Sequence, residues 1–128
     1  MTRVERYGRR DLTYSQWHRR VEPYTRSTLP YVDLDAVEYC HKCGEPLALL
    51  ELAQDVGQEF KATTVMRKLA AKAGLPAYLV FYKKGRGGII GFRVRQVYPR
   101  YTGFAALTPD EYVSFLHSLR AKHSCGGR

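Results

Sequence analysis

Three acidic side chains have the types and spacing that could do chemistry. Asp33 and Asp35 alternate within one apolar segment, and Glu51 lies in the next apolar segment. Carboxylates inside apolar strands are costly unless they bind a cation or meet a basic group. If the two segments pair, the three carboxylates could hold one Mg²⁺ ion, which prefers oxygen ligands. The alternative is that an aspartate pairs with an arginine and that Glu51 ends its strand near water.

The segment between these two predicted strands contains a Cys-x-x-Cys-Gly motif, from Cys40 through Cys43 to Gly44. The spacing and the trailing glycine are typical of a zinc knuckle, in which a tight turn presents two thiolates to one Zn²⁺. One knuckle supplies half of the ligands. The others could come from a second subunit or from His41, His117, His123 or Cys125. The alternative is two reduced cysteines in a hairpin turn.

The chain is strongly basic, with a net charge of +9 from 21 basic and 12 acidic residues. We expect a nucleic-acid partner, DNA over RNA, and no membrane, because no basic amphipathic helix with an exposed apolar face is evident. The candidate phosphate-binding residues lie on a helix, in a glycine-rich turn and on a strand: Lys61, Arg67, Lys68, Lys72, Lys83, Lys84, Arg86, Arg93 and Arg95. The alternative is a solvated surface.

The periodicity of the apolar residues predicts the helices. One covers 13–20, with Thr13 and Gln16 as a capping box, and a second covers 61–73. The last begins at Thr108-Pro109-Asp110-Glu111, which combines a capping box with proline at the first helical position.

Alternating or continuous apolar residues predict the strands, which are expected over 31–39, 47–53, 77–82 and 89–98. The order is therefore α-β-β-α-β-β-α in a single α/β (α+β) domain over 13–122. A basic flexible arm is expected over 1–12 and a flexible tail over 123–128.

The length of 128 residues suits one compact domain with its own core. No segment approaches the length of a membrane span, and the charged N-terminus does not match a secretory signal. Three cysteines, an odd number, argue against a disulfide framework and fit a reducing cytoplasm.

The chain resembles small phage or bacterial members of the PD-(D/E)XK, or restriction-endonuclease-like, superfamily. The resemblance covers roughly residues 13–98 and includes Trp17-His18 in the first helix and the acidic strand over 33–39. It implies a central mixed β-sheet and a Mg²⁺-dependent nuclease site. In that site Asp35 and Glu51 would be the metal ligands and Asp33 an accessory carboxylate.

The chain departs from the superfamily pattern at Ala53, where the motif has a lysine that helps to orient or activate water. Gln54 or Lys61 would have to replace that lysine. Three hypotheses follow: a nuclease-like protein that cleaves phosphodiesters, a non-cleaving DNA- or RNA-binding phage accessory protein, and a small zinc-stabilised protein-interaction module. A phage-encoded protein would act in the host cytoplasm, and a homodimer could form through a sheet edge.

Overall fold

The computed structural model describes residues 11–20 and 30–125. The chain divides into two compact units, Met1–Val32 and Asp33–Arg128. Most of the basic arm predicted over 1–12 therefore lies outside the described residues, as do residues 126–128 of the predicted tail. No helix in the described ranges is long and apolar enough to cross a membrane.

The first unit contains helix α1 (Thr13–Arg20), in the range predicted from the sequence. Asp11 Oδ1 accepts hydrogen bonds from the Thr13 N–H at 2.9 Å and from the Thr13 hydroxyl at 2.6 Å. Asp11 is thus the acceptor at the start of this helix, whereas the sequence predicts that Thr13 itself is the cap. The rings of His18 and Tyr31 lie 4.4 Å apart.

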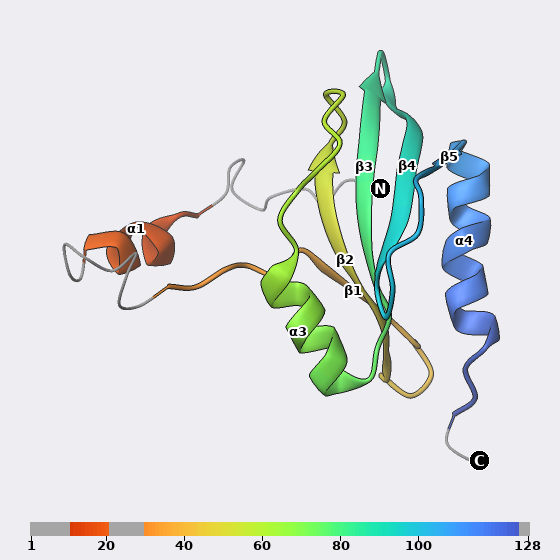
Figure 1. Cartoon of the computed structure of the whole chain (residues 1–128), viewed down its shortest axis with the longest axis horizontal. Coiled ribbons are helices and arrows are strands. Elements are labelled where there is room, and N and C mark those ends of the chain that lie inside the picture. Colours follow the sequence, from red (N-terminus) through yellow and green to blue (C-terminus); the bar gives the residue numbers. More distant parts are fainter. Residues whose placement is uncertain (1–10, 21–29, 126–128) are drawn as a thin grey trace. The chain divides into compact units, whose positions relative to one another are not determined.

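A five-stranded sheet is the framework of the second unit (Figure 1). In spatial order its strands are β1 (Ala36–Tyr39), β2 (Pro46–Gln54), β3 (Ala77–Gly85), β4 (Gly88–Tyr98) and β5 (Ala105–Leu107). β2 and β3 run parallel, whereas every other neighbouring pair is antiparallel. A parallel pair needs a crossover connection, and helix α3 (Thr64–Ala73) lies within it. The sequence prediction of an α+β fold with a mixed sheet is confirmed.

Two helices cover opposite faces of this sheet. Helix α3 packs on the face formed by Leu49, Ala77, Leu79, Phe81 and Val97. Helix α4 (Pro109–Ala121) packs on the other face, formed by Leu50, Val80 and Val94. Because successive residues of a strand point to opposite sides, the apolar run at the centre of β2 contributes to both cores.

Helix α4 begins as the sequence predicts. The Thr108 hydroxyl accepts from the Glu111 N–H at 3.1 Å, and the Glu111 carboxylate accepts from the Thr108 N–H at 2.9 Å. Pro109 occupies the first turn. The capping box is therefore complete.

The main differences from the sequence prediction concern β1, α3 and β5. β1 begins at Ala36, so Asp33 and Asp35 precede the strand and do not lie within it. The reason is local: the Asp35 carboxylate, rather than a backbone carbonyl, accepts the Leu52 N–H at 2.9 Å, and this contact replaces the next ladder bond. Helix α3 begins at Thr64 instead of Lys61, and β5 was not expected at all.

Candidate functional site

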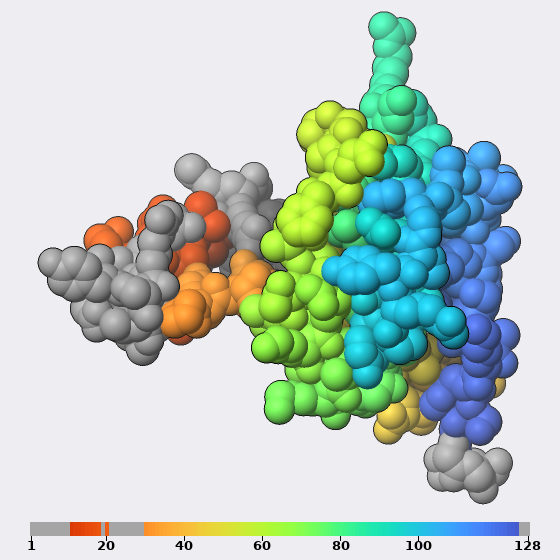
Figure 2. All heavy atoms as spheres, viewed as in Figure 1, coloured from red at the N-terminus to blue at the C-terminus, as the bar shows by residue number. Residues whose placement is uncertain are grey.

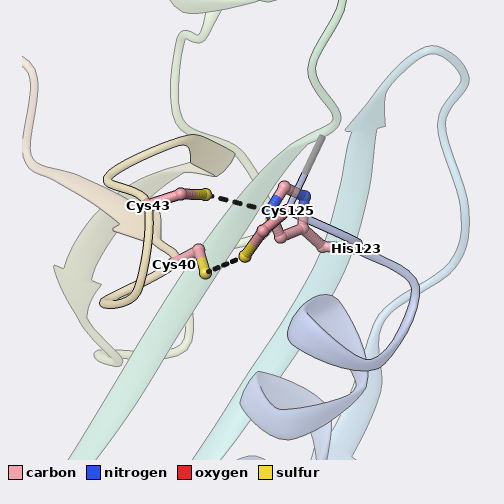
Figure 3. A group of neighbouring side chains, drawn as sticks. All are labelled: Cys40, Cys43, His123 and Cys125. Atoms are coloured by element: carbon pink, nitrogen blue, oxygen red, sulfur yellow. Dashed lines mark hydrogen bonds between the residues drawn. The ribbon is translucent and has the colours of Figure 1, made fainter. Parts of the chain in front are cut away.

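The turn between β1 and β2 carries Cys40 and Cys43. The Gly44 N–H donates to the Cys40 carbonyl at 2.7 Å, and the Cys40 N–H donates to the Glu45 carbonyl at 2.9 Å, so the turn is tight. Gly44 has a φ of 78°, which a residue with a side chain rarely adopts. This backbone directs both thiols toward the segment that follows α4 (Figure 3).

His123 and Cys125 approach the turn from the end of α4. The His123 N–H donates to the Arg120 carbonyl at 3.1 Å, which continues the helical turn beyond the last residue of the helix. Arg120 Nη2 also donates to Glu38 Oε1 of β1 at 2.7 Å. This ion pair fixes the end of α4 beside the strand that leads into Cys40.

These four residues form what we call the Cys–His cluster: Cys40, Cys43, His123 and Cys125. Their ligand atoms all lie within 4.8 Å of one another. The Cys40 and Cys125 sulfurs are 3.8 Å apart, and the Cys43 sulfur is 3.3 Å from His123 Nε2 (Figure 3). All three cysteines are reduced and form no disulfide. The cluster could therefore hold a metal ion.

The thiols of the cluster differ in acidity. The backbone N–H of Cys43, and next that of Lys42, point to the Cys40 sulfur and lower the pKa of that thiol to about 7. Hydrogen bonds with the sulfurs of Cys43 and then Cys40 raise the pKa of Cys125 to about 11. The Cys40 thiolate therefore forms near neutral pH, and it is the thiolate that binds metals.

The structure selects two partners among those left open by the sequence. His123 and Cys125 complete the cluster, although they lie in the range predicted as a tail. His41 is exposed in the turn and His117 is exposed on α4, and neither belongs to the cluster. The signal in the sequence was the His-x-Cys spacing directly after a helix. Only the fold shows that this segment lies beside the Cys-x-x-Cys turn.

The acidic residues are gathered at the start of β1 and on β2. The β1–β2 register pairs Ala36 with Leu50, so Asp35 is the next residue toward Glu51. Glu51 is only 13% exposed, and its Oε2 lies 2.7 Å from Lys61 Nζ. That distance is one of direct ion pairing, so Lys61 places a cation beside Glu51.

The other predicted members of the acidic site are Asp33 and Gln54. Asp33 is exposed ahead of β1, and Gln54 is exposed at the end of β2. The backbone carbonyl of Gln54 accepts from Gln58 Nε2 at 2.9 Å. Of the two candidates for the missing lysine, Lys61 is the one that contacts Glu51. Among the described residues, the group of three or more side chains placed to hold a metal ion together is the Cys–His cluster, and Asp33, Asp35 and Glu51 do not form such a group. The predicted Mg²⁺ therefore has no support from this geometry.

A second ion pair, half-buried, lies just after the end of β2. Arg93 Nε is 2.9 Å from Asp55 Oδ2, and Arg93 Nη2 is 3.0 Å from Asp55 Oδ1, a two-point contact. The guanidinium also lies 4.9 Å from the Phe81 ring and 4.8 Å from the Phe104 ring. The hydrogen bond from Arg93 lowers the pKa of Asp55 to about 2. The positive charge of Arg93, a candidate for phosphate binding, is therefore already paired with the carboxylate of Asp55.

This pair predicts a pH dependence of stability. Because the folded-state pKa of Asp55 is depressed, its contribution is complete above the unfolded pKa of about 4 and is lost as the pH falls toward 2. The melting temperature of the wild type should therefore exceed that of Asp55→Asn at neutral pH. The difference between the two melting temperatures should narrow as the pH falls from about 4 to about 2. A difference that stays constant over this range would show that the charge of the Asp55 carboxylate does not stabilise the fold.

The remaining basic candidates fall into two groups. Lys83, Lys84 and Arg86 are exposed at the turn between β3 and β4, whose tip protrudes in Figure 2. Arg67, Lys68 and Lys72 lie on α3, and Arg95 lies on β4. The contact between the Arg67 guanidinium and the Tyr101 ring joins α3 to the segment after β4.

Comparison of this chain with protein-family models, with curated proteins and with solved structures found no match. The resemblance to the PD-(D/E)XK superfamily therefore depends on the residues of this chain alone.

Proposed function

We propose that this chain is a nucleic-acid-binding, nuclease-like protein that cleaves phosphodiesters with a divalent cation. One observation carries the proposal: Lys61 Nζ lies 2.7 Å from Glu51 Oε2. Asp35, whose carboxylate accepts the Leu52 N–H, is the next position opposite Glu51 in the β1–β2 register. A lysine thus pairs with the glutamate although it is missing from its usual place in the sequence. The restriction-endonuclease-like arrangement is part of this proposal, supported by the β1–β2 hairpin and the α3 crossover to a parallel β3.

The residues would divide the chemistry as follows. Asp35 and Glu51 would hold Mg²⁺, which stabilises charge on the phosphate and lowers the pKa of a bound water. Asp33, exposed ahead of β1, is the accessory carboxylate. Lys61, whose ammonium group lies 2.7 Å from Glu51, would orient the attacking water. The basic residues of α3, of β4 and of the β3–β4 turn would bind the phosphates on either side.

The test is a cleavage assay on single- and double-stranded DNA and RNA, with Mg²⁺ or Mn²⁺, comparing the wild type with Glu51→Gln. The substitution keeps the shape of the side chain and removes its charge. Cleavage by the wild type alone supports the site. Equal cleavage by both proteins contradicts it, provided that their melting temperatures agree.

We also propose that zinc occupies the Cys–His cluster. In a tetrahedral site with Zn–S bonds of about 2.3 Å, two sulfurs are about 3.8 Å apart, and a sulfur and a nitrogen are about 3.5 Å apart. The Cys40–Cys125 separation of 3.8 Å and the Cys43–His123 separation of 3.3 Å fit these edges. Three thiolates and one imidazole are a common set of structural zinc ligands. Metal analysis should find one zinc per chain in the wild type and much less in Cys43→Ser.

A second candidate function is nucleic-acid binding without cleavage. Ala53 in place of the motif lysine favours it, because the Lys61–Glu51 pair can also be a purely structural contact that neutralises a buried carboxylate. Binding that is steeply salt-dependent, yet unaffected by Mg²⁺ and by Glu51→Gln, would identify this function. Stoichiometric zinc without binding to any nucleic acid would instead identify a zinc-stabilised interaction module.

A further inference from the structure

An aromatic ring with two guanidinium groups lies on the face of the sheet covered by α3. Tyr101, in the segment after β4, is 51% exposed. The Arg67 guanidinium of α3 lies 5.4 Å from the centre of its ring, and that of Arg95 on β4 lies 5.1 Å from it. Both distances are those of cation–π contacts. Figure 2 shows α3 and the segment after β4 side by side on the viewed surface.

The two guanidinium groups are held by uncharged acceptors. Arg95 Nε donates to the Thr102 carbonyl at 2.8 Å, and Arg67 Nε donates to the Thr63 hydroxyl at 3.2 Å. Within residues 11–20 and 30–125 neither arginine has a carboxylate at ion-pair distance, in contrast to Arg93 with Asp55. Their positive charges are therefore oriented and, among the described residues, have no acidic partner, which favours an anionic ligand.

This group lies on the same sheet face as the acidic site. The register pairs Glu51 with Leu79 and Leu79 with Arg95, so the three residues form one row across β2, β3 and β4. Residues paired in this way project to the same side of the sheet. With strands about 4.8 Å apart, Arg95 lies about 10 Å from Glu51 along that row.

We propose that Tyr101, Arg67 and Arg95 form a platform for single-stranded nucleic acid, with an unpaired base stacked on the Tyr101 ring and its phosphates on the two arginines. The inference rests on the proposed function, because it names the substrate class of the same face. A half-exposed ring offers a base a stacking surface, and flanking guanidinium groups bind the backbone. Bases in a duplex are already stacked on each other, so the platform selects single strands or unpaired ends.

The test is fluorescence anisotropy of labelled oligothymidine, oligouridine and a duplex, without divalent cation, using the wild type, Tyr101→Leu and Tyr101→Phe. Leucine keeps an apolar side chain but cannot stack. Tyr101→Leu should bind single strands about tenfold more weakly, with duplex binding unchanged, and Tyr101→Phe should bind like the wild type. Arg95→Gln should reduce the log–log salt slope for single strands by about 0.7. The oligothymidine and oligouridine arms separate DNA from RNA.

Two results would overturn the platform. Equal single-strand affinity of Tyr101→Leu and the wild type would mean that the ring only packs between the arginines. Equal loss of single-strand and duplex binding would mean a general phosphate surface. Failure of the proposed cleavage is distinguishable, since it appears in the cleavage assay with Mg²⁺ and leaves binding without divalent cation intact. A wild type that binds no nucleic acid of any kind would overturn both proposals. Thermal melting of each variant shows whether it is folded.

Discussion

Treatment with a chelator is expected to lower the melting temperature of this protein by about 15 °C or more. The Cys–His cluster joins positions 80 and 85 residues apart in the chain, so a bound metal closes a long loop between the hairpin turn and the end of α4. A ligand present at a thousand times its Kd stabilises the folded state by about 4 kcal/mol. Each kcal/mol shifts the melting temperature of a domain of this size by roughly 4 °C.

The measurement is a thermal melt with and without chelator, for the wild type, His123→Ala and His117→Ala. His123→Ala should melt early and respond little to the chelator, because one ligand has already been removed. His117→Ala is the matched control, since His117 is exposed on α4 outside the cluster. A wild-type melting temperature that is insensitive to the chelator, with no zinc in the protein, would refute the zinc proposal.

Replacing Lys61 by methionine is expected to reduce phosphodiester cleavage by about a hundredfold or more. The ammonium group is the only cation that contacts Glu51 among the described residues, so its loss removes the group proposed to orient water beside the metal ligands. Positioned proton-transfer groups typically contribute a factor of about 10²–10⁴ to a rate.

The assay compares initial cleavage rates of the wild type, Lys61→Met and Lys61→Arg at saturating Mg²⁺, with Lys68→Met as the control. Lys68 is exposed on α3, the helix that follows Lys61, and has no ion-pair partner within the described residues. Both substitutions remove one positive charge, so they should weaken nucleic-acid binding similarly and differ only in the chemical step. Similar rates for Lys61→Met and Lys68→Met would show that Lys61 has no part in the chemistry.

The sequence predicts those features of the fold that depend on local chemistry. The capping box at Thr108 and Glu111 is decided within one helical turn, and it forms as expected. The start of β1 depends instead on a side chain, since the Asp35 carboxylate takes the Leu52 N–H that a strand residue would otherwise pair. β5 is a three-residue strand, Ala-Ala-Leu, whose weak β-propensity gives no signal.

Each candidate site likewise combines residues that the sequence indicates with residues that only the fold brings close to them. The Cys-x-x-Cys turn is visible in the sequence, but its partners depend on where α4 ends. That position is set by packing of Tyr112 on Phe92, with ring centres 3.9 Å apart, and by the Arg120–Glu38 ion pair. Lys61 likewise reaches Glu51 only because α3 begins after it, which leaves Lys61 in the preceding loop.

The two outermost strands of the sheet are its shortest, with four residues in β1 and three in β5. An exposed strand edge is a template on which another chain can add, and long flat edges promote aggregation. Short edges offer few unpaired backbone groups, so open-ended strand addition gains little hydrogen bonding. Strand addition at these two edges should therefore contribute little to a pairing of two copies, which we expect to depend on side-chain contacts.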